Sequence, residues 1–405
     1  MHMKHITPSH RALSAMIFAL IGLSLALPGA VFAKSTEDLE VSGWIPYWRD
    51  SEGIKDAKKH LSQIDMVFPF AFTVTTQGEI RDQAGLSDKE WKAFIKTAQK
   101  KNVEVIPTVM WSDGASIHAV LSSTSTRKAH IKGIADMVEK GKFDGVDIDY
   151  ESKESETINY FSLFLKELKA ELGNKKLTCA IEARTPPESL YREVPAVINY
   201  ANDYKEIAKH CDRVELMTYD QQRADLLLNK SKNGAPYIPL SDADWVRKVI
   251  EFALKDIPKE KLMVGIPTYG HHWAVTVAPD WYRDYKKIGA LNVPDILDVA
   301  KEYKVTPTRN KGGEMSFTYL PKSSKVKLSS ALKIPKDTPK GNIVAARALA
   351  YANKTGKEVT FNIAWYSDAE AMKQKIDLAK EYDLRGVAFF KFDGEEDKKV
   401  WNYLK

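Results

Sequence analysis

Strand-like and helix-like segments alternate along this chain of 405 residues, and the alternation limits the folds open to it. Eight segments rich in β-branched and apolar residues read as strands, with helix-like stretches between them. They are Val41–Trp48, Met66–Thr73, Val103–Met110, Phe143–Glu151, Leu177–Ala183, Arg213–Tyr219, Lys261–Tyr269 and Gly386–Phe392. Parallel strands joined by helices have right-handed connections and are covered by those helices. The predicted fold is therefore α/β, a TIM (β/α)8 barrel.

The regular alternation stops between residues 271 and 366. This segment has helix-like stretches near Asp295–Tyr303 and Ile343–Asn353, and strand-like runs at Met315–Leu320 and Glu358–Ala364. Loops of this length without structure of their own are uncommon in compact domains. We therefore predict a small α+β insertion domain, residues 271–366, after strand seven of a barrel that spans residues 34–405.

The fourth strand carries a row of acids. Apolar and acidic residues alternate from Val146 onward, and a period of two sends them to opposite faces of a strand. The acidic face consists of Asp147, Asp149 and Glu151. Three carboxylates so close to one another cannot all be ionised, so at least one of them keeps its proton near neutral pH. A general acid that protonates a glycosidic oxygen needs such a proton.

This strand has two other interpretations, a solvated acidic edge strand and a divalent-metal site. A solvated acidic edge strand fits poorly, because Phe143 and Tyr150 flank the acids and an amphipathic helix follows. A transition-metal site would call for nearby histidines, and none is present in this stretch. The nine histidines show no ligand spacing such as His-Glu-x-x-His, so we expect no metal and no organic cofactor.

Active sites of TIM barrels lie at the carboxyl ends of the strands. Strand six ends in Met217-Thr218-Tyr219-Asp220, where Met217 and Tyr219 share a face and Asp220 closes the strand. Strand seven ends in Gly265-Ile266-Pro267-Thr268-Tyr269-Gly270. These strand ends and Glu151 are therefore expected to surround one cleft.

The acidic strand resembles the signature of glycoside hydrolase family 18, Asp-Gly-x-Asp-x-Asp-x-Glu. All five specified positions match, namely Asp144, Gly145, Asp147, Asp149 and Glu151. The ends of strands six and seven also resemble the family's Met-x-Tyr-Asp and Gly-Ile-Pro-x-Tyr-Gly motifs. The Pro-Phe-x-Phe run of strand two and a Tyr-Gly-x-x-Trp run ending at Trp273 are similar to the bacterial spore-germination and cortex-lytic branch.

The resemblance implies a retaining, substrate-assisted mechanism without cofactors. Glu151 would protonate the leaving oxygen, and the N-acetyl carbonyl oxygen of the sugar would attack the anomeric carbon. Asp149 would orient that group, and Asp147 would share a proton with Asp149. Tyr219 and Asp220 would hold the acetamide.

Further residues are expected to bind the sugars. The candidates are Trp44, Phe72, Met217, Tyr269, Trp365 and Phe390. Trp44 begins the strand-one motif, and Trp365 lies just before the chain re-enters the barrel. Phe390 stands where chitinases usually place a tryptophan as the floor of the cleavage subsite, and its ring offers a smaller stacking face than indole. Glu182, near the end of strand five, either lines the cleft or forms an ion pair with Arg184 or another nearby cation.

Residues 1–33 read as a secretory signal peptide. Lys4 and Arg11 precede an apolar run, Ala12–Leu27, and small residues end at Ala33, where we expect cleavage. An uncleaved anchor is the alternative, although the run is short for a bilayer span of about 20 residues. The expected protein is secreted or associated with the cell wall, without stable membrane insertion after cleavage.

Charge gives little support for nucleic-acid binding. Removing Lys4 and Arg11 lowers the formal charge from +6 to +4, and no clustered basic face is evident. The expected partner is an N-acetylglucosamine-containing polysaccharide, chitin or peptidoglycan, bound by a monomer. The leading interpretation is a glycosidase that cleaves β-1,4 bonds, and the rival is a chitinase-like lectin that binds such sugars without cutting them.

Cys179 and Cys211 both lie in apolar strand-like patterns. A disulfide between neighbouring strands is one outcome for an exported chain, and two buried free thiols are the other. The sequence alone favours the free thiols.

Overall fold

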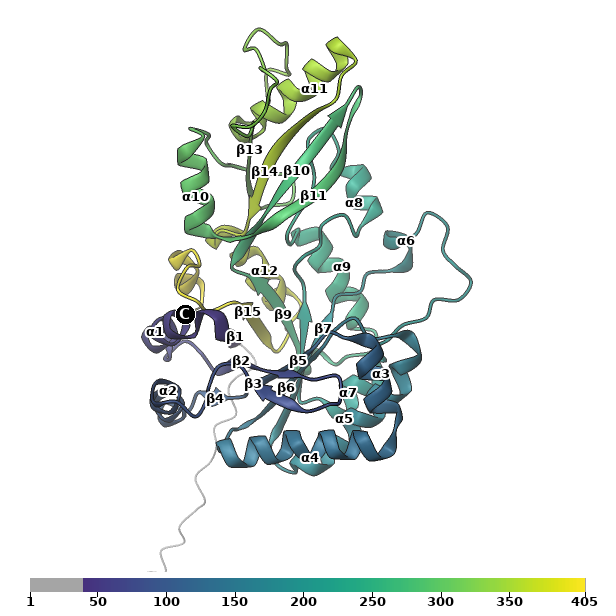
Figure 1. Ribbon diagram of the computed structural model, residues 1–405, viewed down its shortest axis with the longest axis vertical. Helices are drawn as coiled ribbons and strands as arrows, with labels where there is room; N and C mark the ends of the chain where they lie inside the picture. The colour runs from purple at the N-terminus through teal and green to yellow at the C-terminus, as the bar shows by residue number, and fades with distance from the viewer. Residues whose placement is uncertain (1–38, 405) are drawn as a thin grey trace, which may run out of the picture. The chain divides into compact units, whose positions relative to one another are not determined.

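A closed barrel forms the base of the computed structural model, which describes residues 39–404 (Figure 1). Its parallel strands are β1 (Glu40–Pro46), β2 (Met66–Val74), β4 (Glu104–Val105) with β5 (Thr108–Trp111), β6 (Gly145–Tyr150), β7 (Lys176–Glu182), β8 (Arg213–Met217), β9 (Leu262–Pro267) and β15 (Gly386–Phe390). Pairing of β1 with both β15 and β2 closes the ring, and β3 (Ile80–Asp82) adds an antiparallel edge to β2. The TIM barrel prediction is confirmed.

Helices surround the barrel because the outer faces of its strands are apolar and must be covered. The longer ones are α1 (Asp50–His60), α2 (Lys89–Lys100), α3 (Gly114–Ser122), α4 (Thr124–Gly141), α5 (Ile158–Leu172), α7 (Tyr204–His210), α9 (Ala243–Ala253) and α12 (Ala369–Glu381). Two short helices, α6 (Pro187–Leu190) and α8 (Leu226–Ser231), lie in the connections that follow β7 and β8. A 3-10 helix, Lys398–Tyr403, lies near the end of the chain.

Two apolar clusters correspond to the two faces of the barrel strands. The inner cluster contains Trp44, Met66, Phe68, Phe70, Ile106, Ala180, Met263 and Ala388. The larger outer cluster joins the strands to the helices, for example Ile148 of β6 and Phe164 of α5. Within residues 39–404, no helix is long and apolar enough to cross a bilayer.

A second sheet extends from the carboxyl end of β9. Its order is β11 (Trp281–Asn292), β10 (Tyr269–Ala278), β14 (Val359–Tyr366), β13 (Met315–Tyr319) and β12 (Thr308–Arg309). Helices α10 (Val293–Glu302) and α11 (Ile343–Thr355) accompany it, and the sheet rises above the barrel in Figure 1. The long hairpin of β10 and β11 was not predicted, because Arg283, Asp284, Lys286 and Lys287 hide the strand alternation of β11.

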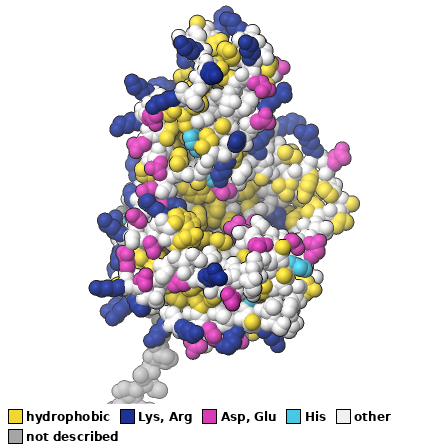
Figure 2. All heavy atoms as spheres, viewed as in Figure 1, with side chains coloured by type: hydrophobic (Ala, Val, Ile, Leu, Met, Phe, Trp, Pro, Cys, Tyr) yellow, Lys and Arg dark blue, Asp and Glu magenta, His cyan; other side chains and the backbone are white. Residues whose placement is uncertain are grey.

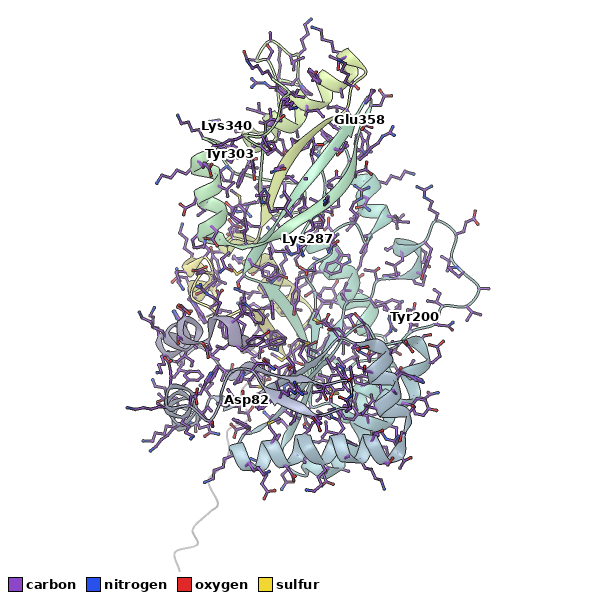
Figure 3. All side chains as sticks on the ribbon, viewed as in Figure 1. Asp82, Tyr200, Lys287, Tyr303, Lys340 and Glu358 are labelled. Atoms are coloured by element: carbon purple, nitrogen blue, oxygen red, sulfur yellow. A yellow bond between two sulfur atoms is a disulfide. The ribbon has the colours of Figure 1, made fainter. Side chains whose placement is uncertain are left out.

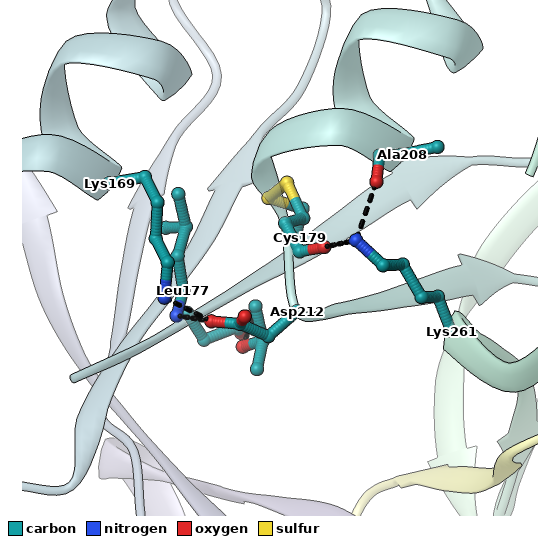
Figure 4. The surroundings of a disulfide bond; sticks show 9 residues. Lys169, Leu177, Cys179, Ala208, Asp212 and Lys261 are labelled. Atoms are coloured by element: carbon teal, nitrogen blue, oxygen red, sulfur yellow. Dashed lines mark hydrogen bonds and ion pairs between the residues drawn. A yellow bond between two sulfur atoms is a disulfide. The ribbon is translucent and has the colours of Figure 1, made fainter. Parts of the chain in front are cut away.

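Cys179 of β7 and Cys211, which follows α7, form a disulfide (Figure 4). Their Cα atoms are 6.1 Å apart. Lys261 supports this corner, since its Nζ donates to the carbonyls of Ala208 at 2.7 Å and Cys211 at 3.0 Å. The preference for two free thiols was therefore wrong, because the end of α7 packs beside β7 and brings residues that are 32 positions apart into bonding range.

Candidate active site

A cavity of 430 Å³ opens at the carboxyl ends of the barrel strands. Asp149 and Glu151 line it from the end of β6. The other lining residues include Trp44, Phe70, Glu182, Met217, Tyr219, Asp220, Trp245, Tyr269 and Phe390. Segments far apart in the sequence therefore meet at one cavity, which is called the catalytic cavity here because active sites of TIM barrels lie at this end of the strands.

Asp147 lies beneath the cavity and has no exposed surface. Its Oδ2 accepts hydrogen bonds from Thr108 Oγ1 at 2.8 Å and Trp44 Nε1 at 3.0 Å, and its Oδ1 accepts one from Thr178 Oγ1 at 2.9 Å. Burial raises the pKa of Asp147, and these three donors oppose that rise. The donors hold the carboxylate in place and favour its charged form.

Asp149 lies above Asp147 in a different environment. Its Oδ1 is buried and accepts no hydrogen bond from the described residues. Burial, with the charges of Glu151, Asp147 and Glu182, raises the pKa of Asp149 well above its ordinary value. The three donors on Asp147 favour its charged form, whereas burial and the neighbouring acids favour the protonated form of Asp149.

Glu151 faces the cavity from the strand end. Burial and then the neighbouring Glu182 raise the pKa of Glu151, while Lys153 acts in the opposite direction. Lys153 is buried, and its Nζ lies 3.7 Å from Glu182 Oε2. Glu182 also accepts hydrogen bonds from Ser152 N at 3.0 Å and Asn202 Nδ2 at 2.8 Å. Glu182 therefore both lines the cleft and pairs with a cation.

Tyr219 and Asp220 lie on another wall of the cavity, together with Met217. The Tyr269 hydroxyl donates to Asp220 Oδ1 at 2.7 Å, and His271 Nε2 lies 3.2 Å from the same oxygen. Burial lowers the pKa of His271 to about 4, so its ring is neutral at pH 7. Asp220 is consequently held by its neighbours while its side chain stays 44% exposed to the cleft.

Phe390 lies at the end of β15 and lines the catalytic cavity and a neighbouring one of 390 Å³. Its ring stacks with Tyr219 at a centroid distance of 5.7 Å and lies 6.0 Å from Trp44. The structure thus brings together the predicted residues Trp44, Met217, Tyr219, Tyr269 and Phe390. Figure 2 shows hydrophobic side chains within the hollow between the barrel and the second sheet.

Phe72 does not reach the catalytic cavity, contrary to prediction. The register between β2 and β5 shifts after Phe70, so that Phe70 is opposite Thr108 and Phe72 opposite Val109. This β-bulge turns Phe72 to the helix side, where it lines a separate cavity with Ile95 and Met137. Phe70 lines the catalytic cavity in its place.

Trp365 also lies outside the catalytic cavity. Only 1% of its surface is exposed, and its Nε1 donates to the buried Glu314 at 2.5 Å. Glu314 in turn accepts from the amides of Leu240 and Ser241, in the connection after β8. Trp365 therefore fastens the second sheet to the barrel. Its position before the chain re-enters the barrel was no guide to where the ring points.

Some residues of the site were missed. Trp245 of α9 lines the catalytic cavity, and Trp48 lines the neighbouring cavity. Neither tryptophan belongs to a recognisable sequence motif. Glu215 is fully buried on β8, with neither carboxyl oxygen hydrogen-bonded to a described residue. The parity that pointed to Met217 also includes Glu215, so this signal was available. Among residues 39–404, no group of His, Cys, Asp and Glu side chains is arranged to hold a metal ion.

Residues 42–395 match the model of glycosyl hydrolases family 18. The chain belongs to this family and is a glycoside hydrolase, as the acidic strand predicted.

Among curated relatives, the uncharacterized glycosylase YvbX of Bacillus subtilis is 21% identical over 393 residues, which is 95% of this chain and 97% of YvbX.

Two solved structures share the fold. The spore cortex-lytic enzyme SleL of Bacillus cereus superposes with a TM-score of 0.64 at 18% identity, over 91% of this chain and 74% of SleL. The chitinase of Cycas revoluta in complex with (GlcNAc)3 gives 0.63 at 19% identity, over 90% of this chain and 98% of the chitinase.

Proposed function

We propose that this glycoside hydrolase cleaves β-1,4 bonds next to N-acetylglucosamine with retention of configuration. The observation that carries the proposal is the environment of three acids on β6. Asp147 is held by three donors, Asp149 is buried with a pKa raised well above its ordinary value, and Glu151 faces the cavity with a raised pKa. An acid with a raised pKa at the end of a strand can retain the proton that acid catalysis at a glycosidic oxygen requires.

The reaction begins with proton transfer from the Glu151 carboxyl group to the glycosidic oxygen. The bond from the anomeric carbon to that oxygen breaks, while the carbonyl oxygen of the sugar's own acetamido group forms a bond to the same carbon. Glu151, now a carboxylate, then takes a proton from water as the water oxygen attacks the anomeric carbon and the acetamide leaves it. Each step conserves charge, and Glu151 regains its proton.

The two aspartates are placed to assist this attack rather than to perform it. Asp147 is enclosed and cannot reach a sugar in the cavity. Asp149 lies beside Glu151 and can accept a hydrogen bond from the acetamide N–H, which orients the carbonyl oxygen for attack and stabilises the positive charge as the ring forms. Tyr219 and Asp220 face the same cavity and would fix the other side of the acetamide.

Chitin and peptidoglycan are the proposed polymers, since relatives of this chain are named as chitinases and as spore cortex-lytic enzymes. We also propose that the protein is exported. The signal peptide at residues 1–33 lies outside the described residues, and support comes from the disulfide, which forms in oxidising compartments.

The test measures product release from N-acetylglucosamine oligomers and from purified peptidoglycan. Glu151→Gln should lower kcat by about 10²–10⁴ and keep sugar affinity, because the amide retains shape but has no transferable proton. Proton NMR of the fresh product should show the β anomer. An α anomer would refute retention, and turnover by the variant at the wild-type rate would refute Glu151 as the acid.

The same assay separates an enzyme from a lectin. A chitinase-like lectin would bind the oligomers with similar affinity in both proteins and release no product from either. That outcome would replace the hydrolytic proposal with sugar binding alone.

A further inference from the structure

A second cavity, of 720 Å³, lies outside the predicted site. It is called the outer groove here, and its residues include Tyr191, Arg192, Arg223, Leu227, Lys230 and Trp281. Most come from the connections after β7 and β8, whereas Trp281 begins β11 of the second sheet. In Figure 3, Tyr200 marks the segment between α6 and α7, and Lys287 marks β11. The outer groove lies between the elements that carry these two residues.

The outer groove gathers exposed apolar side chains. Nine large hydrophobic residues in the described part of the chain are exposed, and four of them line this groove, namely Tyr191, Val194, Leu227 and Trp281. Trp281 is 37% exposed and Tyr191 38%. A concentration of exposed apolar surface in a concave site is typical of ligand binding, and aromatic rings suit the apolar faces of sugars.

The outer groove and the catalytic cavity meet at one connection. Both are lined by the connection between β8 and α8, where Ala224 faces the catalytic cavity and Arg223 faces the outer groove. A polymer held with one bond at Glu151 can therefore extend along this connection into the outer groove.

The charges of the two cavities are opposite. Asp149, Glu151, Glu182 and Asp220 line the catalytic cavity without a lining lysine or arginine. The outer groove has Arg192, Arg223 and Lys230 against a single acid, Glu188.

Two of the outer groove's cations are free to meet a ligand. Neither Arg192 nor Lys230 forms an ion pair with another residue in the range 39–404, and both are exposed. The third, Arg223, lies over the Tyr285 ring at 4.9 Å, which holds its guanidinium at the wall. An excess of unpaired positive charge beside an acidic reaction centre favours a ligand with separate anionic groups.

We propose that the outer groove binds the flanking sugars of a glycan that carries carboxylate groups on its sugars or on attached peptides. Trp281 and Tyr191 contact the sugar faces, and Arg192, Arg223 and Lys230 pair with the carboxylates. The natural substrate is then an acidic cell-wall glycan rather than neutral chitin. This inference rests on the proposed function, since it names the class of polymer that the same cleft cleaves.

The experiment measures binding to the full chain carrying Glu151→Gln, so that affinity is read without turnover. Three hexasaccharide probes are compared: an N-acetylglucosamine oligomer, a peptidoglycan fragment with free carboxylates, and the same fragment with its carboxylates amidated. With the outer groove unchanged, the protein should bind the fragment with free carboxylates more tightly than the amidated fragment. The preference should shrink as salt rises from low to high concentration, because exposed charge pairs are screened.

Replacing Arg192 and Lys230 by Gln should reduce this preference about tenfold, as expected for two partly exposed ion pairs. The matched control replaces two exposed lysines of α1, Lys55 and Lys58, and should keep the preference. Trp281→Ala should weaken binding of hexasaccharides more than that of disaccharides, because only long probes reach the groove. Melting temperatures near that of the parent protein show that each variant is folded.

Equal affinity for the free and amidated fragments, or an unchanged preference in the double variant, would overturn the inference. Turnover of neutral oligomers by the wild-type protein would then still uphold the proposed function. If binding depends on the carboxylates but the wild-type protein cleaves no oligomer, the role of the outer groove is upheld. The proposed hydrolysis of these sugars is then refuted.

Discussion

At the scale of single residues, Glu151 shows how burial prepares an acid. A carboxylic acid with an ordinary pKa is ionised at neutral pH and has no proton to give. Burial and the nearby Glu182 raise the pKa of Glu151, and Lys153 limits the rise. A raised pKa widens the pH range over which Glu151 keeps the proton that it donates, and the opposing effect of Lys153 favours the carboxylate that later accepts a proton from water.

The pH profile tests this balance. Because Glu151 must be protonated to act first, kcat/KM should fall as pH rises through its raised pKa. Glu182→Gln removes a neighbouring negative charge, so the alkaline limb should move to lower pH. Measuring kcat/KM between pH 4 and 9 for both proteins checks the shift. An alkaline limb that stays in place would mean that Glu182 does not act on Glu151.

Glu215 is a residue whose burial costs stability in a pH-dependent way. Burial, followed by the charge of Asp147, raises the pKa of Glu215 well above its ordinary value. The folded chain therefore keeps this proton at pH values where the unfolded chain loses it, so stability falls as pH rises above the unfolded pKa of about 4.3.

Glu215→Gln should remove this penalty. The amide cannot ionise, so the variant should be about as stable as the wild type near pH 4 and increasingly more stable toward pH 8. Melting temperatures at a series of pH values give the difference. A constant difference across the series would show that Glu215 does not titrate between the two states.

At the scale of elements, one irregularity in β2 decides which phenylalanine meets the substrate. The period of a strand predicts Phe68, Phe70 and Phe72 on one face, and the bulge after Phe70 breaks that period. Bulges leave no clear mark in a sequence, because they depend on how two strands pair. The assignment of Phe72 therefore had to fail, while Asp147 and Asp149 on the regular β6 follow their parity.

Phe70 and Phe72 form a matched pair for testing the bulge. Phe72→Ala should cost about 3–5 kcal/mol of stability, as for other buried phenylalanines, with little change in kcat/KM. Phe70→Ala should lower kcat/KM, because its ring lines the catalytic cavity. Denaturant unfolding and oligosaccharide kinetics for both variants give the comparison, and a reversed pattern would return Phe72 to the cleft.

At the scale of the whole molecule, long-range order was predictable and local contacts were not. Alternating segments suffice for the barrel, since few topologies satisfy eight β/α units. The strand-end motifs suffice for the acids, Tyr219, Asp220 and Tyr269. Trp48 and Trp245 could not be found this way, because their position depends on how connections of different length pack. Trp365 was misplaced for the same reason, since its partner Glu314 lies 51 residues away in sequence.

The buried disulfide can report local opening of the barrel. Cys179 and Cys211 have no exposed surface, so a small reductant meets the sulfurs only after β7 and the segment behind it part. The rate at which dithiothreitol reduces the disulfide to thiols then measures the rate of that opening, without any added label. Slower thiol release with a bound oligosaccharide would mean that occupying the cleft at one end of the strands steadies their far end.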